Sequence, residues 1–141
     1  MTTDLFKKSA GIIGGGGFFN SKELAQFPGF IIKVLKVDDQ YINPKFKQDG
    51  PGVRLAADII AFDQEGRVVA EKHGALWDCG TNLWKRLGAD VDDVLAIRVW
   101  KDGHYWNLAD VSGELLEKMG AEWQRRQEAL SEAIADAPDE I

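Results

Sequence analysis

The chain has 141 residues and a formal net charge of −6, with 45% hydrophobic and 28% charged residues. This length fits one domain, and a composition so close to that of globular proteins excludes wholesale disorder. A single cysteine, Cys79, excludes an internal disulfide framework, and no apolar run is long enough for a signal peptide or a membrane span. We therefore expect a soluble, cytoplasmic protein with no membrane partner.

The charge is distributed unevenly along the chain. Residues 1–56 carry eight Lys or Arg and five acidic residues, a net charge of +3, whereas residues 111–141 carry three and eight, a net charge of −5. Such asymmetry predicts a body that binds a polyanion and an acidic tail. A C-terminal helix with a solvated acidic surface explains the same numbers, so both interpretations stay open.

Residues 1–29 predict a glycine-rich N-terminal arm outside the core. The four consecutive glycines at 14–17 oppose both helix and strand, because glycine loses the most backbone entropy on ordering. They are not a phosphate-binding loop, because Phe18 follows where a Walker motif needs Gly-Lys-Ser/Thr, and the Rossmann spacing fails as well. A short helix capped by Asn20 or Ser21 closes this segment.

Five strands are predicted next, with one helix between the third and the fourth. Apolar, β-branched runs mark these strands at 30–37, 53–63, 67–77, 94–101 and 104–110. A long loop with prolines and glycines, 38–52, joins the first two strands, and Asp102-Gly103 joins the last two as a two-residue hairpin turn. Residues 81–89 form the helix. The predicted fold of 30–110 is mainly β, a five-stranded OB-type Greek-key barrel.

An amphipathic α-helix is appended to the barrel at 111–135, and an acidic tail follows at 136–141. Its apolar residues recur at helical spacing and form one stripe. The stripe comprises Leu115, Met119, Trp123, Leu130 and Ile134. It predicts either packing against the barrel or a homodimer formed through this helix.

The hairpin at 94–110 has two different faces. A turn at Asp102-Gly103 pairs Trp100 with Tyr105, and side chains then alternate across the two strands. One face is almost wholly apolar and predicts a core face, with Ile97, Val99, Trp106 and Leu108. The opposite face is unsuited to a core, with Arg98, Trp100, Tyr105 and Asn107. We interpret Trp100 and Tyr105 as a stacking platform; the alternative is that they pack under the C-terminal helix.

Aromatic side chains interleaved with basic ones are typical of proteins that bind single-stranded nucleic acid. Any base stacks on an aromatic ring, while Lys and Arg contact the phosphates. The long loop has the same pattern, because Phe46 stands between two lysines. The residues predicted to contact nucleic acid are Lys33, Lys36, Lys45, Phe46, Lys47, Arg54, Arg98, Trp100 and Tyr105.

The strand order, the basic loop Pro44-Lys45-Phe46-Lys47 and the acidic end resemble phage-encoded OB-fold single-stranded-DNA-binding proteins. The resemblance spans residues 30–141 as architecture, without a long shared motif, and the tail follows a helix where the family has a long linker. It implies sequence-independent binding of single-stranded DNA in replication, recombination or repair. It also implies that replication or repair proteins are bound by the tail residues Asp136, Asp139, Glu140 and Ile141.

Catalytic and metal-binding constellations are not recognisable in the sequence. His73, His104 and Cys79 lack the spacing of a zinc site, and Cys79 has no adjacent base that would make it a nucleophile. Asp58 and Asp63 are predicted on opposite faces of a strand and do not form an acid–base pair. We expect no enzyme activity, metal or cofactor. The alternative function is a protein-interaction module that uses the barrel and the C-terminal helix.

Overall fold

The computed structural model describes residues 17–41 and 52–135, with side chains up to residue 132. Its elements are α2 (Ser21–Leu24), β1 (Gly29–Tyr41), β2 (Gly52–Phe62), β3 (Val68–Trp77), α3 (Gly80–Leu87), β4 (Val94–Asp102), β5 (Tyr105–Asp110) and α4 (Gly113–Ala135). The five strands form one antiparallel sheet in the order β3-β2-β1-β4-β5. The predicted mainly β fold, with a helix between the third and fourth strands and a helix after the fifth, is confirmed at this level.

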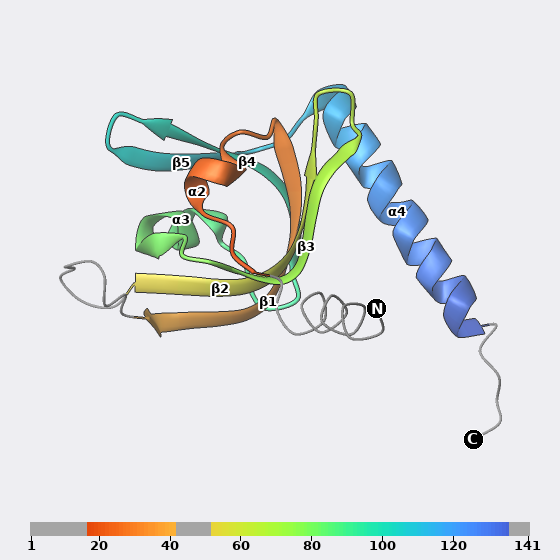
Figure 1. Cartoon of the computed structure of the whole chain (residues 1–141), viewed down its shortest axis with the longest axis horizontal. Helices are drawn as coiled ribbons and strands as arrows, with labels where there is room; N and C mark the ends of the chain where they lie inside the picture. The colour runs from red at the N-terminus through yellow and green to blue at the C-terminus, as the bar shows by residue number, and fades with distance from the viewer. Residues whose placement is uncertain (1–16, 42–51, 136–141) are drawn as a thin grey trace, which may run out of the picture.

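The sheet curls into a half-barrel around β1 (Figure 1). β1 pairs with β2 along most of its length but with β4 only from Phe30 to Lys33. Register shifts between Val34 and Lys36 in β1, and between Ala57 and Ile59 in β2, are irregularities of the kind that bend strands. α2 and α3 lie between the β4–β5 hairpin on one side and the C-terminal end of β1 and N-terminal end of β2 on the other (Figure 1).

The main core lies on the inner face of the curled sheet. In β2, Val53, Leu55 and Ala57 are buried while the residues between them are half-buried, as expected for a strand with one face on a core. Leu83 and Leu87 lie one helical turn apart in α3 and fill the same core. α3 ends at Gly88, whose φ of +58° is the left-handed conformation that glycine adopts without strain.

Residues 17–28 pack on the sheet and contribute side chains to the core, so the prediction of an arm outside the core over 1–29 is wrong for this described part. Phe19 and Leu24 are buried, at 3% and 0% exposure. The Phe19 N–H donates to the Leu76 carbonyl at 3.0 Å, which adds a short parallel bridge to the edge of β3. The Nε1 of Trp77 donates to Ser21 Oγ at 3.0 Å. This packing could not be predicted from the glycine-rich sequence, because a single bridge leaves no periodic pattern. Residues 1–16 lie outside the described part of the chain.

β1 is longer than the predicted strand 30–37. It continues to Tyr41 because Asp38 pairs with Arg54 and Tyr41 with Gly52, so polar residues remain in the ladder. The start of the predicted loop 38–52 is therefore strand. The apolar pattern ends at Val37, because Asp38, Asp39 and Gln40 are exposed and polar although they continue the strand.

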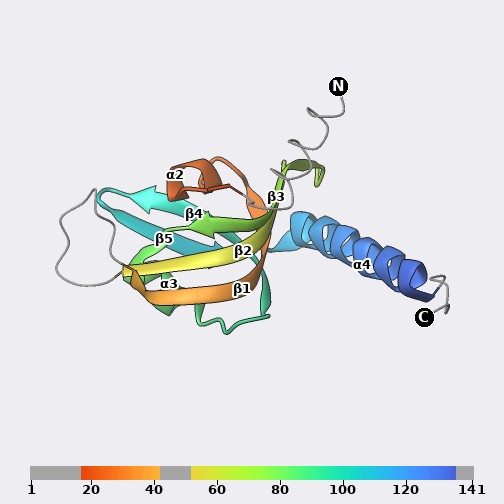
Figure 2. The same ribbon diagram turned by 60° about the horizontal axis from the view of Figure 1, so that its bottom comes forward.

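A second, smaller apolar cluster joins α4 to the outer face of the sheet. Its buried members are Ile31, Ile60, Phe62, Val111 and Met119. Leu115 and Trp123 pack against it, which confirms this part of the predicted stripe. Leu130 is 57% exposed, and the side chain of Ile134 lies outside the described residues. α4 projects away from the half-barrel in both views (Figures 1 and 2). Of the helices described, none has the length and apolar character needed to cross a membrane.

Candidate nucleic-acid interface

The β4–β5 hairpin turns one residue later than predicted. Asp102 pairs with Tyr105, so Gly103 and His104 form the turn, with Gly103 at a φ of +61°. Trp100 therefore pairs with Asn107 and not with Tyr105, which corrects the predicted register. The correction moves β5 by two residues along β4. Because side chains alternate with a period of two, every residue stays on its predicted face.

The predicted core face of the hairpin is confirmed. Ile97 and Val99 are buried in the main core, and Trp106 and Leu108 pack against it as partly buried side chains. At the open end of this face, Lys101 Nζ lies 5.4 Å from the centroid of the Trp106 ring. Trp106 is thus a core residue, as expected.

The opposite face carries the predicted platform, which we call the hairpin group: Arg98, Trp100, Tyr105 and Asn107. The guanidinium carbon of Arg98 lies 4.7 Å from the centroid of the Trp100 ring, a cation–π contact. Tyr105 is 69% exposed. It stands diagonally across from Trp100, a spacing of roughly 7–8 Å between backbones that lets large side chains lie next to each other. The two rings therefore offer neighbouring positions for flat ligands.

The hairpin group is not covered by α4, contrary to the alternative. Neither Trp100 nor Tyr105 belongs to either of the two apolar clusters of the described residues, and Trp123 of α4 packs in the smaller one. Arg86 of α3 approaches instead, and its Nη1 donates to Asn107 Oδ1 at 2.7 Å. Arg86 and Arg98 are the cations on this side of the hairpin, with Asp102 as the neighbouring acid, whereas Lys101 lies on the core face beside Trp106. This local excess of positive charge attracts phosphates.

A second group lies on the outer face of β1, β2 and β3, where Arg54 contacts Tyr41, Phe18 and Asp78. The guanidinium carbon of Arg54 lies 3.9 Å from the centroid of the Tyr41 ring and 5.4 Å from that of Phe18. Its Nη2 donates to the Tyr41 hydroxyl at 2.7 Å and to Asp78 Oδ2 at 3.0 Å. The hydrogen bond to Asp78 raises the pKa of Arg54. Since Asp78 already neutralises this guanidinium, a phosphate must compete with a carboxylate for it.

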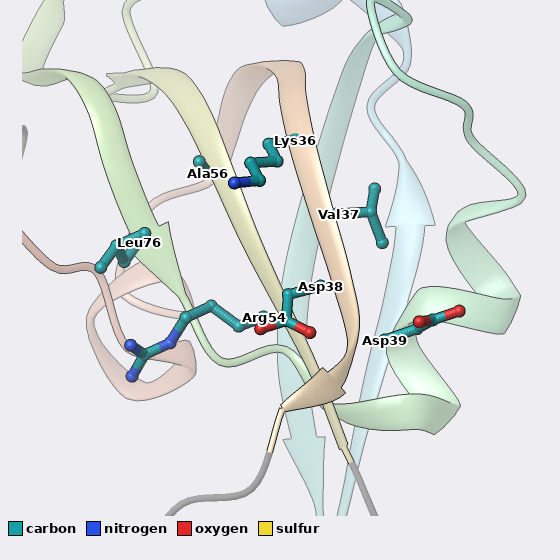
Figure 3. Close-up of a pocket in the computed structure, with 7 residues that line it drawn as sticks. All are labelled: Lys36, Val37, Asp38, Asp39, Arg54, Ala56 and Leu76. Atoms are coloured by element: carbon teal, nitrogen blue, oxygen red, sulfur yellow. The ribbon is translucent and has the colours of Figure 1, made fainter.

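A shallow pocket of about 390 Å³ lies beside Arg54. Lys36 reaches from β1 across toward Ala56 of β2, while Val37 and Asp39 lie on the other side of β1 (Figure 3). Asp38 and Asp39 also line the pocket, so the acids there balance the cations. Lys33, the third predicted cation of this face, is half-buried opposite Asp58.

Lys72, which is not among the predicted site residues, is a further cation near the second group but lies on the inner face of β3, where it pairs with Ile59. Its Nζ donates to the Phe18 carbonyl at 2.6 Å and lies 4.4 Å from the centroid of the Phe19 ring. Phe18 itself is 56% exposed. These contacts depend on the bridge between residues 17–19 and β3, and no local pattern in the sequence indicates that bridge.

The hairpin group and the second group do not share one groove. The strands that carry the two groups turn their other faces toward the same main core. α2 and α3 lie between the hairpin and the C-terminal end of β1 and N-terminal end of β2 (Figure 1). The structure therefore does not bring Lys33, Lys36 and Arg54 to the predicted platform. The loop residues Lys45, Phe46 and Lys47 and the tail residues Asp136, Asp139, Glu140 and Ile141 lie outside the described part of the chain.

The burial of Cys79 and the hydrogen bonds of Asp58 and Asp63 are those of residues that support the fold. Cys79 is 7% exposed, and burial raises the pKa of its thiol to about 12, so the thiol is protonated at neutral pH. Asp58 Oδ1 accepts from the Gly74 N–H at 2.9 Å. Asp63 Oδ1 accepts from the N–H groups of Glu65 and Arg67, both at 2.9 Å, and so closes the β2–β3 turn. In residues 17–41 and 52–132, no three His, Cys, Asp or Glu side chains gather as metal ligands.

The chain was also compared with known proteins. No protein-family model matches it, and no curated protein and no solved structure matches it either.

Proposed function

We propose that the chain binds single-stranded nucleic acid, DNA in the first place, without sequence preference and through the hairpin group. The observation that carries this proposal is the pair of rings on the non-core face: Tyr105 is 69% exposed, and Trp100 lies under the Arg98 guanidinium. A base that stacks on an aromatic ring gains about 1–3 kcal/mol whatever its sequence.

The strand order supports an OB-type Greek-key barrel as the finer description of the half-barrel. OB folds place a helix between their third and fourth strands, where α3 lies, and they bind oligonucleotides with loops that include the one between strands 4 and 5. That loop is the tip of the hairpin that carries Tyr105. The proposed interface thus lies where this architecture would place part of it.

A strand of nucleic acid would use the two rings for successive bases. One base stacks on Tyr105, the next on the Trp100–Arg98 pair, and Arg98 is close enough to contact the intervening phosphate. Asn107 has its side-chain oxygen occupied by Arg86, so it is a poor reader of base edges. Stacking and charge, which every sequence offers, then provide the affinity.

The net charge of −6 sets a limit to this interaction. Long-range attraction to a polyanion is weak for an acidic protein, so binding depends on the local cations of the hairpin and falls with salt. The acidic tail, Asp136 to Ile141, stays a proposal for contact with replication or repair proteins.

Titration of the full chain with fluorescent oligo-dT tests the proposal. We expect saturable binding, quenching of tryptophan fluorescence by stacking, and weaker binding as salt is raised. Double-stranded DNA of the same length is the control, because its bases are not free to stack on Tyr105. Absence of binding at low salt, or equal binding of the duplex, would contradict the proposed function.

A further inference from the structure

α4 carries a second stripe beside the one that packs on the sheet. Its positions follow each other at spacings of four, three, four and three residues, the spacing of helices that pack against a neighbouring helix. The stripe comprises Leu116, Gly120, Trp123, Gln127 and Leu130, and none of these five residues is charged. Leu116 and Leu130 are 40% and 57% exposed. Trp123 also packs against the smaller apolar cluster, whereas Leu116, Gly120, Gln127 and Leu130 are exposed on a helix that projects from the sheet (Figure 2).

An apolar pocket of about 140 Å³ opens at one end of the stripe, between α4 and the beginning of β4. Leu116, Gly120 and Trp123 form its helical wall, and Val94, which is 43% exposed, stands opposite. Ile31 lies at the sheet side. The pocket has the chemistry to receive an aliphatic side chain, and no side chain of residues 17–41 or 52–132 fills it.

Gly120 indicates that something approaches the helix closely at this pocket. A glycine inside a helix destabilises it relative to alanine, so its presence needs a reason. Packing against the described residues gives none, because a Cβ at Gly120 would meet none of their atoms within 4 Å. Gly29 is the contrast: a Cβ there would lie 2.9 Å from Val111 Cγ2. The space at Gly120 is therefore available to a group from another molecule.

We propose that this group is Leu130 of a second copy of the chain, with the two α4 helices antiparallel and crossing near residue 125. Gly120 and Leu130 are equally distant from residue 125 along the helix. In this arrangement each Leu130 meets the Gly120 pocket of its partner, and each Trp123 meets Gln127. A two-fold axis makes the two contacts identical, as in most homodimers. The inference does not depend on the proposed nucleic-acid binding.

The charged residues beside the stripe are compatible with two α4 helices packed against each other. Arg126, on the flank toward the sheet, is held by Glu71 at 2.7 and 2.9 Å and by Glu122 at 2.6 Å. Its charge is therefore neutralised where the two copies of Arg126 would approach each other. On the other flank the neutral side chain of Gln124 would meet its own copy. A second copy thus fits the stripe without an unpaired like-charge contact at its centre.

Sedimentation equilibrium of the full chain tests the dimer. We expect the mass of two 15.6 kDa chains for the wild type and of one chain for Leu130→Glu, with the same circular dichroism. The matched control is Ala129→Glu, which adds the same charge to the neighbouring exposed residue on another side of α4 and should stay dimeric. A monomeric wild type, or a dimeric Leu130→Glu variant, would overturn the proposal.

Disulfide crosslinking tests the register. Gly120→Cys and Leu130→Cys are prepared separately and then mixed and oxidised mildly; buried Cys79 is protected in both. Antiparallel helices predict a crosslink between the two variants in the mixture and none in either variant alone. Crosslinking of either variant to itself would indicate parallel helices and would overturn the proposed arrangement.

Discussion

Arg126 of α4 and Glu71 of β3 form a two-pronged ion pair. Nη1 and Nη2 of Arg126 donate to the two carboxylate oxygens of Glu71 at 2.7 and 2.9 Å, and the arginine Nε donates to Glu122 at 2.6 Å. Such bidentate pairs add directional specificity to their energy. This pair, together with the apolar contacts of Met119, fixes the direction in which α4 leaves the barrel.

The attachment of α4 should weaken in acid. The hydrogen bonds from Arg126 to Glu71, and from Arg125 and Arg126 to Glu122, lower the pKa values of these carboxyl groups below the ordinary 4.5. A lowered folded-state pKa stabilises the fold fully above the unfolded-state pKa, and this stabilisation is lost as the pH falls through the folded values. The protection of amides in α4, after correction for the intrinsic exchange rate at each pH, should therefore fall between about pH 5 and about pH 3 more than that of amides in β2.

Arg126→Gln provides the control for this effect. It removes the arginine partner of Glu71 and one of the two arginine partners of Glu122, so α4 should already exchange faster at neutral pH and should respond less to acid. Identical acid profiles for the variant and the wild type would show that the ion pair does not hold the helix.

The two tryptophans of the hairpin should differ in their effect on stability. Trp106 packs against the main core, so Trp106→Ala should lower the free energy of unfolding by about 3 kcal/mol. Trp100 belongs to neither apolar cluster of the described residues, so Trp100→Ala should cost less than about 1 kcal/mol. Urea unfolding followed by circular dichroism measures both. The reverse order would mean that the faces of the hairpin are assigned the wrong way round.

Cys79 should be unreactive in the folded protein. Its thiol is 7% exposed and its pKa is raised to about 12, so hardly any thiolate is present at neutral pH. We expect a colourimetric disulfide reagent to react only as fast as the chain unfolds and at once in denaturant. Rapid reaction of the native chain would contradict the buried position.

Arg98 and Arg54 should differ in the salt dependence of oligo-dT binding. If Arg98 contacts a phosphate, Arg98→Ala should reduce the slope of log affinity against log salt by about 0.7. Arg54→Ala should leave the slope unchanged, because Asp78 neutralises this guanidinium. A changed slope for Arg54→Ala alone would move the interface to the second group.

The sequence allowed the strands and the hairpin faces to be predicted, because both depend on local periodicity. The faces of the hairpin were predicted correctly although its turn was not, because moving β5 by two residues preserves the alternation of side chains. Pairings between distant segments were not predictable. The contact of Phe19 with β3 and the ion pair of Arg54 with Asp78 join residues far apart in the chain, and neither leaves a pattern in its own neighbourhood.

The separation of the predicted site residues has the same origin. Lys36 of β1 and Trp100 of β4 both lie on strands with the composition of a nucleic-acid-binding surface, but the curl of the sheet directs β1 and the β4–β5 hairpin apart (Figure 1). Curvature arises from register shifts such as the one between Val34 and Lys36, and a single sequence does not show where they occur.

The most direct test of the account is the affinity of Tyr105→Ala for oligo-dT, measured beside that of Phe18→Ala. Tyr105→Ala removes a ring that is 69% exposed from the hairpin group, and Phe18→Ala removes a ring that is 56% exposed from the second group. We predict that Tyr105→Ala loses about 1–3 kcal/mol of binding free energy while Phe18→Ala binds as the wild type does. Wild-type affinity of a folded Tyr105→Ala variant would contradict the claim that the hairpin group binds nucleic acid.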